Sequence, residues 1–576
     1  VAIYQRDRFD EYSNFARIGN GSLGGKGRGL AFIGTMLNRY PQLKYPNLDI
    51  TIPHTVVICT DIFDEFMEQN DLYPFVLSEA TDEEILSRFL KAKLPESLLE
   101  DLQTFLKVVK TPIAVRSSSL LEDSHYQPFA GIYSTYMVPH VDSGNEDTLN
   151  YLRNAIKAVY ASVFYRDSKA YMTATSNLID QEKMAVVLQE TVGTSYNGRL
   201  YPTMSGVARS LNFYPIGDET AEEGIANVAL GLGKYIVDGG LTLRFSPAHP
   251  HKILQTSQLD IALKETQTRF YALDLKDMGK EMSVDDAFNL LKLNVKEAVN
   301  DNSLKYVAST YDAYDQTLNS GVYPEGRKVI TFSGILENDA FPLADALSNI
   351  LKIGQIEMGR PIEIEFALNV NPDDDEKATF YLLQIRPIVD AKNEIKEDLS
   401  VIHEEETLIR SAKVLGQGVI NDVCDIIYVK TKDFNSQNNG LIAREIERLN
   451  HQYIEQGESY VLVGPGRWGS SDPWLGIPVK WPHISQARVI VECGLENYRV
   501  DPSQGTHFFQ NLTSFGVGYF TINQYNADGF FDIDFLDKME AKHETNYIRC
   551  VHFNNPIIIK MDGRKGFGVA LKPYVQ

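Results

Sequence analysis

Two glutamates alternate with apolar residues in the stretch from Ile362 to Phe366. A β-strand turns successive side chains to opposite faces, so Glu363 and Glu365 would share one face, roughly 7 Å apart, and the apolar side chains would be buried on the other. Carboxylate oxygens suit Mg²⁺, which usually keeps part of its shell for phosphate oxygens and water. The stretch therefore predicts a strand that presents two candidate metal ligands.

A second apolar stretch, Phe380 to Ile385, is expected to pair antiparallel with the first. We interpret the acidic run between them, Asp373 to Glu376, as a solvated hairpin loop rather than a cation site. The pairing would add Gln384 to the metal ligands and place Arg386 where it can neutralise a phosphoryl group. A surface hairpin with a Glu–Arg ion pair explains the same residues, so both interpretations stay open.

Two further positions are candidates for phosphate binding. Arg116 follows a short predicted strand, Ile113 to Val115, and precedes three serines. Its planar fork matches phosphate, and hydroxyls or turn amides can meet the remaining oxygens, although a structural ion pair explains Arg116 equally well. Gly131 stands among aromatic residues and suits either a loop over phosphates or a tight turn.

The glycine-rich stretch GSLGGKGRGLAF begins at Gly21 and contains Lys26. It fails the P-loop pattern because Gly27, rather than Ser or Thr, follows the lysine. A match to G-x-G-x-x-G at Gly19 to Gly24 follows a poor strand, so a dinucleotide-binding turn is not favoured. Farther on, a buried strand is predicted at residues 185–189, and backbone groups at 190–192 would suit the edge of a base.

The composition is that of an ordinary globular protein. With 576 residues the chain is too long for one core, so two to four domains are expected. Its formal net charge of -22 argues against a protein that grips nucleic-acid backbones. Four cysteines without C-x-x-C spacing and the lack of a bilayer-length apolar run predict a cytoplasmic protein. Because the chain opens on Val1, a processed chain or one cut from a longer protein is expected.

Mixed helix and strand patterns between residues 20 and 390 predict an α+β (mixed α/β) fold. A charged segment, 391–406, is interpreted as a linker. A smaller α/β domain is then expected over 407–576.

Several stretches occur together and in order, and the set resembles the ATP-binding part of phosphoenolpyruvate synthase and pyruvate phosphate dikinase. They are GGKGRGL, AVRSSSLLEDS, FAGIYSTY, VVLQETVG, SGVARSLNFYP, ALGLGKYIVDG and PIEIEFALN with FYLLQIRPI. The resemblance covers about residues 20–390. It implies an ATP-grasp fold over 1–390, with subdomains of about 1–110, 111–250 and 251–390 that hold ATP between two lobes.

The resemblance also implies roles for individual residues. The phosphates would be contacted by Lys26, Arg116 and the loop at Gly131. The adenine and ribose pocket would be lined by Gln189, Glu190 and Val192. Mg²⁺ would be bound by Glu363, Glu365 and Gln384, with Arg386 at the reacting phosphates. Glu363 has a longer side chain than the acidic residue usual in the family, so a slightly different metal geometry is expected.

The C-terminal part departs from that family, and a degenerate form of the family's swivelling domain is one interpretation of residues 407–576. The carrier-histidine motif G-G-x-x-[ST]-H-x-A-I-x-A-R does not occur, and the 170 residues after the linker are fewer than the roughly 250 of a TIM barrel. His507, after Gly505 and Thr506, is a candidate phosphoacceptor near an expected helix start. A structural histidine beside two phenylalanines is the competing interpretation. The glycine turn at 464–469 would expose Arg467 and Trp468 to an anion or a flat group, or be a plain structural turn.

The first functional hypothesis is an Mg²⁺-dependent ATP phosphotransferase, a kinase or dikinase. Its phosphate acceptor is unidentified, and a phosphohistidine domain on another chain or a missing segment is one candidate partner. The second is a nucleotide-binding regulatory module without turnover, and the third is an ATP-grasp ligase that forms an acyl phosphate. No nucleic-acid or membrane partner is expected.

Overall fold

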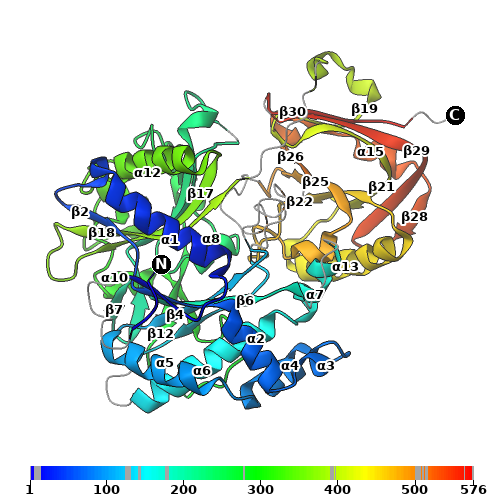
Figure 1. Ribbon diagram of the computed structural model, residues 1–576. Coiled ribbons are helices and arrows are strands. Elements are labelled where there is room, and N and C mark those ends of the chain that lie inside the picture. The colour runs from blue at the N-terminus through cyan, green and yellow to red at the C-terminus, as the bar shows by residue number, and fades with distance from the viewer. Residues whose placement is uncertain are drawn as a thin grey trace. The chain divides into compact units, whose positions relative to one another are not determined.

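The computed structural model describes residues 2–5, 14–122, 131–140, 145–174, 181–213, 215–276, 279–388, 395, 397–499, 508, 512, 517–563 and 565–573 (Figure 1). Helices and strands are mixed throughout the described residues, which confirms the α+β class. The chain forms two compact units. The first comprises Val1–Leu211, Glu222–Ile236 and Leu241–Pro387, and the second comprises Asn212–Ala221, Val237–Gly240 and Ile388–Gln576. The predicted linker and subdomain boundaries stay predictions.

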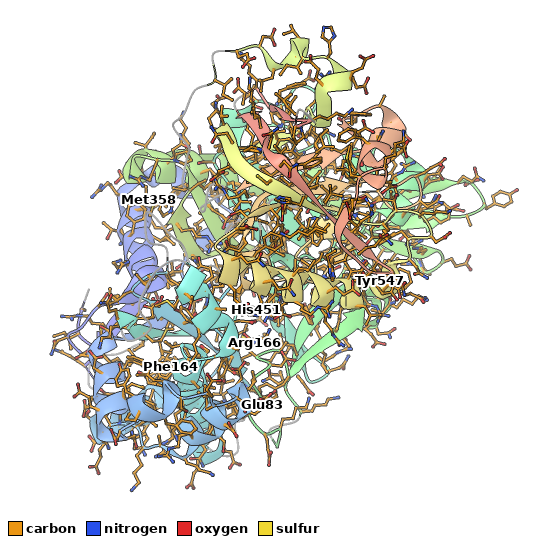
Figure 2. All side chains as sticks on the ribbon, turned by 90° about the vertical axis from the view of Figure 1, so that its right-hand side faces the viewer. Glu83, Phe164, Arg166, Met358, His451 and Tyr547 are labelled. Carbon is orange, nitrogen blue, oxygen red and sulfur yellow. The ribbon has the colours of Figure 1, made fainter. Side chains whose placement is uncertain are left out.

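A five-stranded sheet of the first unit has the order β1 (Phe15–Ile18), β3 (Thr55–Ile58), β6 (Met184–Glu190), β4 (Ile113–Ser119), β5 (Thr135–Val138). β4 is longer than the predicted strand, because Arg116 and the three serines continue it. Helices α2 (Thr60–Gln69), α4 (Asp82–Lys91) and α6 (Asn145–Ser162) accompany this sheet. The rings of Phe63 and Phe89 pack against Phe164, which is labelled in Figure 2.

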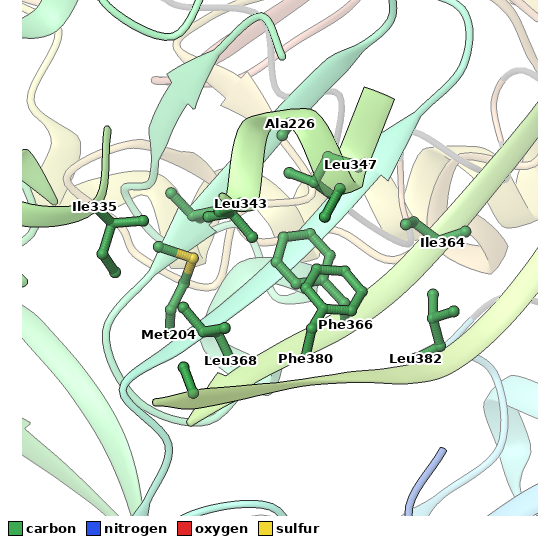
Figure 3. Packing of buried hydrophobic residues seen from close by; sticks show 14 of the residues in the cluster. Met204, Ala226, Ile335, Leu343, Leu347, Ile364, Phe366, Leu368, Phe380 and Leu382 are labelled. Atoms are coloured by element: carbon green, nitrogen blue, oxygen red, sulfur yellow. The ribbon is translucent and has the colours of Figure 1, made fainter. Parts of the chain in front are cut away.

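A six-stranded sheet of the same unit carries the predicted hairpin. Its order is β11 (Leu243–Phe245), β10 (Ile225–Ala229), β9 (Met204–Arg209), β17 (Ile362–Val370), β18 (Ala378–Pro387), β2 (Leu48–Thr51). β17 and β18 pair antiparallel as predicted, and the acidic connection is a mostly exposed loop. Ile364, Phe366 and Leu368 are buried under α12 (Leu343–Met358), and the Phe366 and Phe380 rings stack at 4.8 Å (Figure 3).

Two smaller sheets complete the first unit. One has the order β13 (Leu290–Asn294), β12 (Arg269–Asp274), β8 (Arg199–Tyr201), β7 (Thr194–Tyr196), and the other has the order β15 (Thr317–Ser320), β14 (Ala308–Asp312), β16 (Arg327–Ile330). A short connection leads from β6 of the five-stranded sheet into β7. The five-stranded and four-stranded sheets are therefore joined directly by residues 191–193.

The second unit is built on one large mixed sheet. Its order is β20 (Val414–Leu415), β26 (Gly518–Ile522), β25 (Ala487–Cys493), β22 (Tyr460–Pro465), β21 (Gln417–Val429), β29 (Ile548–Asp562), β30 (Phe567–Leu571), β19 (Thr407–Ser411), β27 (Phe530–Phe531), and β28 (Ala541–Glu544) also pairs with β29. β21, β22, β25 and β26 run parallel, with α13 (Asn439–Gln456) connecting the first two. Across the described residues, no helix has both the length and the apolar character needed to cross a bilayer.

Candidate nucleotide site

Arg116, on β4, connects the five-stranded sheet to the β17–β18 hairpin. Its Nη1 donates to the Leu383 carbonyl at 2.8 Å and to Gln189 Oε1 at 3.2 Å. Its Nη2 donates to Gln384 Oε1 at 2.9 Å and to Glu365 Oε2 at 3.1 Å. Three predicted residues, Gln189, Glu365 and Gln384, therefore meet at the buried guanidinium of Arg116.

A β-bulge in β18 contributes to this arrangement. Glu365 pairs with Gln384 and Phe366 pairs with Leu382, so Leu383 is the extra residue. Its carbonyl accepts from Arg116. Bulges re-aim backbone and side-chain groups and are common beside functional sites. The bulge thus lets the hairpin bind Arg116 through a backbone oxygen as well as through side chains.

Glu363 lies between two arginines, one on each neighbouring strand. It pairs in register with Arg209 of β9 and with Arg386 of β18. Arg386 Nε donates to Glu363 Oε1 at 2.8 Å, its Nη2 bonds to the same oxygen, and Arg209 Nη2 lies 2.5 Å from Oε2. All three side chains are 5% exposed or less. Because both oxygens contact guanidinium groups, the metal-binding role of Glu363 stays a prediction.

Arg209 was not predicted as a site residue. The strand period of SGVAR places it on the same face as Val207, but nothing local reveals that this strand pairs with the one that carries Glu363. The sequence offered one signal for Arg209, namely that a charged residue ends an otherwise apolar strand.

Glu365 and Gln384 fit a metal ion better than the other predicted ligands. They face each other across β17 and β18, and both their oxygens accept from the same Nη2 atom of Arg116. One carboxylate and one amide oxygen converging on a cation suit Mg²⁺. Among the described residues, no group of three or more His, Cys, Asp or Glu could hold a metal ion. A metal here would depend on phosphate oxygens and water for most of its shell.

Lys26 lies near the start of α1 (Gly24–Arg39), and its ammonium pairs with the Glu122 carboxylate. Its Nζ also donates to Ser117 Oγ at 3.3 Å. Glu122 is fixed in turn, because its N–H donates to Ser119 Oγ at 2.9 Å and its Oε2 accepts from the Ser119 N–H at 2.8 Å. This reciprocal S-x-x-E pattern was readable in the sequence, although Glu122 was missed. Lys26 therefore meets β4 at the residue next to Arg116.

The glycines around Lys26 allow α1 to approach two sheets. A Cβ on Gly24, whose φ is +70°, would lie 1.8 Å from the Ser118 carbonyl oxygen. A Cβ on Gly29 would lie 2.7 Å from the Ile385 carbonyl oxygen. Only residues without a side chain permit such contacts. The stretch is thus a packing surface that brings α1 against β4 and β18 and Lys26 against β4.

A second buried carboxyl lies behind Glu122. Glu182 Oε2 accepts from the Tyr133 hydroxyl at 2.8 Å. Burial, assisted by the nearby charge of Glu122, raises the pKa of Glu182 to about 7. Protonation at this position near neutral pH is therefore coupled to the charge that holds Lys26.

The residues predicted to line the base pocket end β6 and the connection that follows. Gln189 binds Arg116 and also donates from Nε2 to Thr55 Oγ1 at 3.3 Å. Glu190 Oε2 lies 2.8 Å from Nδ1 of His54. Val192 is half-buried in the connection to β7. Their roles toward a nucleotide stay predictions.

Two further predicted residues are Gly131 and His507. Gly131 is exposed, with φ +68°, just before β5. The residues immediately before it, 123–130, are outside the described part of the chain, and so is His507.

The glycine turn of the second unit differs from the prediction in one respect. Trp468 is buried, since its indole Nε1 donates to the Val491 carbonyl at 3.1 Å and its ring lies against Gly464. Its N–H also donates to Glu492 at 2.9 Å. The expectation that Trp468 is exposed to a flat ligand is therefore wrong, because Gly464 opens space that the indole fills.

Comparison with known proteins identifies the family. The family model described as pyruvate phosphate dikinase, AMP/ATP-binding domain, matches residues 20–407. The chain belongs to this family. The AMP/ATP-binding domain of the pyruvate phosphate dikinase family is of the ATP-grasp type, so the predicted fold is confirmed.

Three curated relatives extend the comparison. The chain is 24% identical over 424 residues to a probable phosphoenolpyruvate synthase of Methanocaldococcus jannaschii, a match that covers 67% of this chain and 29% of the relative. It is 25% identical over 351 residues to a phosphoenolpyruvate synthase of Aeropyrum pernix, covering 59% and 37%. It is 28% identical over 203 residues to the uncharacterized phosphotransferase YvkC of Bacillus subtilis, covering 35% and 22%. The matches thus span 22 to 37% of the relatives' lengths.

Proposed function

We propose that this member of the pyruvate phosphate dikinase AMP/ATP-binding family is an Mg²⁺-dependent ATP phosphotransferase, a kinase or dikinase whose acceptor is unidentified. The observation that supports it most is the meeting of Gln189, Glu365 and Gln384 at the guanidinium of Arg116. This meeting supports a single site, in which phosphate, metal and base contacts from separate stretches would act on one nucleotide.

The proposed roles are those that the resemblance to the family implies for these residues. Phosphate oxygens would be bound by Lys26, Arg116 and the loop at Gly131. The base and ribose would be bound by Gln189, Glu190 and Val192. The metal would be held by Glu365 and Gln384, with Glu363 as the third predicted ligand, and Arg386 would contact the transferred phosphoryl group.

The charge balance of the cluster suits this chemistry. Arg116, Arg209 and Arg386 contact two carboxylates, Glu363 and Glu365. With every group in its usual charged form, the five side chains carry a net charge of one positive unit. Fixed positive groups in a buried site stabilise the charge that develops on a transferred phosphoryl group. A bound Mg²⁺ would supply further neutralisation of the phosphate oxygens.

The test is a product analysis of the full chain incubated with Mg·ATP and candidate acceptors. AMP with phosphate indicates a dikinase, and ADP indicates a kinase or ATPase. Glu365→Ala and Arg386→Ala should each lower turnover by at least about 100-fold, as expected when groups that stabilise transition-state charge are lost. Unchanged turnover in both variants would discard the assigned site.

A second candidate is a regulatory module that binds ATP without turnover. The given residues contain no match to the family's carrier-histidine motif, which a module of this kind would not need. Calorimetry distinguishes the two, because tight Mg·ATP binding with no product in the presence of candidate partners would select the regulatory module.

A further inference from the structure

The guanidinium of Arg116 occupies the position where the two best candidate metal ligands converge. A single nitrogen atom, Nη2, lies 3.1 Å from Glu365 Oε2 and 2.9 Å from Gln384 Oε1. The Arg116 side chain is 10% exposed, so this nitrogen is held within the protein interior. The two oxygens are thus already oriented toward one cationic group.

A divalent cation bound by both oxygens needs that same position. Mg²⁺ takes its oxygen ligands at about 2.0–2.1 Å, much closer than a hydrogen-bond donor, so the guanidinium and the ion cannot occupy the site together. Their like charges also oppose each other at this separation. Occupation of Glu365 and Gln384 by one cation therefore excludes the other.

Polyphosphate offers Arg116 an alternative partner. A guanidinium forms bidentate, charge-assisted hydrogen bonds with phosphate oxygens, which are stronger than its bonds to neutral acceptors such as Gln384 and the Leu383 carbonyl. The metal bridges phosphate oxygens as well. Nucleotide binding therefore gives the arginine a new acceptor and the metal its missing ligands in one step.

We propose that Arg116 and the divalent cation compete for Glu365 and Gln384, so that the metal binds well only when a nucleotide draws Arg116 away. The inference rests on the proposed function, because the cation is the metal of the metal–ATP complex. It makes the metal and the nucleotide mutually dependent, and each raises the affinity of the other by the same factor. Metal ions alone would leave the site in its arginine-bound form.

The experiment measures Mn²⁺ binding to the full chain by electron paramagnetic resonance of the free ion, without nucleotide. Arg116→Met should bind one Mn²⁺ at least about tenfold more tightly than the unaltered chain, because the competitor is gone. Arg116→Gln, which keeps a hydrogen-bond donor near Leu383, is measured alongside in case the methionine collapses into the site. The increase should vanish in Arg116→Met combined with Glu365→Gln.

Arg386→Met is the matched control. It removes the same charge from a group 3.7 Å from Glu365 Oε1, yet its Nε and Nη2 both bond to Glu363. Both variants are therefore also measured with Glu363→Gln, which removes the carboxylate that Arg386 holds. If Arg386→Met and Arg116→Met raised Mn²⁺ affinity alike in that background, the effect would be general electrostatics and the proposal would be overturned. No increase in either neutral variant at position 116 would also overturn it.

A parallel titration with Mn²⁺ and a non-hydrolysable ATP analogue separates this proposal from the proposed function. If the unaltered chain binds the metal–nucleotide pair but the position 116 variants show no gain with metal alone, only the competition fails. If it binds no metal–nucleotide pair, the proposed function fails.

Discussion

Replacing Arg209 by methionine tests whether the buried row of Arg209, Glu363 and Arg386 holds the hairpin in place. The side chains of Arg209 and Glu363 are each 1% exposed, and Arg209 Nη2 lies 2.5 Å from Glu363 Oε2. Breaking a buried pair by removing one partner costs about 3–5 kcal/mol, because the remaining charge is left in a poorly solvated position. Arg386 continues to neutralise Glu363, so we place the cost at the lower end, about 3 kcal/mol.

The assay is hydrogen exchange of the full chain, followed in peptides that cover β9 and β17. A loss of about 3 kcal/mol in local opening free energy corresponds to roughly 100-fold faster exchange, since each 1.4 kcal/mol is a factor of ten. Arg209→Lys keeps the charge but loses the guanidinium geometry, so it should lie between the methionine variant and the unaltered chain.

Arg488→Met serves as the control. Arg488 pairs with Asp422 at 3.0 Å, but both side chains are largely exposed. A surface pair contributes about 1 kcal/mol or less, so exchange around it should change by no more than about fivefold. The exchange rates of β9 and β17 in Arg209→Met are compared with those of β25 in Arg488→Met. If Arg209→Met caused the smaller change, the buried row of Arg209, Glu363 and Arg386 would not hold the hairpin in place.

Three further outcomes are expected. The pKa of Glu182 is raised to about 7 from 4.5. The stability that its protonated form contributes should therefore be complete below about pH 4.5 and lost as the pH rises through 7. In Glu182→Gln, the unfolding midpoint should depend less on pH between pH 5 and 8. Burial also raises the pKa of Glu492, in the second unit, to about 7. The stability of that unit should therefore fall as the pH rises, and a steeper pH dependence in Glu492→Gln would contradict this assignment. Gly24→Ala should lower the free energy of unfolding by at least about 2 kcal/mol, because the new Cβ would collide with the Ser118 carbonyl. Gly34→Ala in the same helix has its nearest neighbour at 4.0 Å and should be neutral or stabilising by up to about 1 kcal/mol in a denaturant titration.

Local sequence patterns predicted the parts of the site that lie on one hairpin. The alternation around Glu363 and Glu365 is visible within five residues, and the acidic loop marks the turn to Gln384 and Arg386. That information is local because a strand has a period of two and a hairpin joins neighbouring segments.

Contacts between distant strands could not be predicted in this way. Arg209 reaches Glu363 because β9 pairs with β17, more than 150 residues later in the chain. Arg116 reaches Gln384 from a different sheet. Such contacts depend on strand order and sheet packing, which the period of any single segment leaves undetermined. The resemblance to a family supplied the expectation that these pieces converge.

A structure of the chain with Mg²⁺ and a non-hydrolysable ATP analogue tests the proposed site most directly. We expect Lys26 and Arg116 to contact the phosphates of one nucleotide, while Glu365 and Gln384 coordinate the metal bound to it. A nucleotide bound elsewhere, or one that contacts Lys26 while Arg116 and Glu365 remain paired with each other, would contradict it.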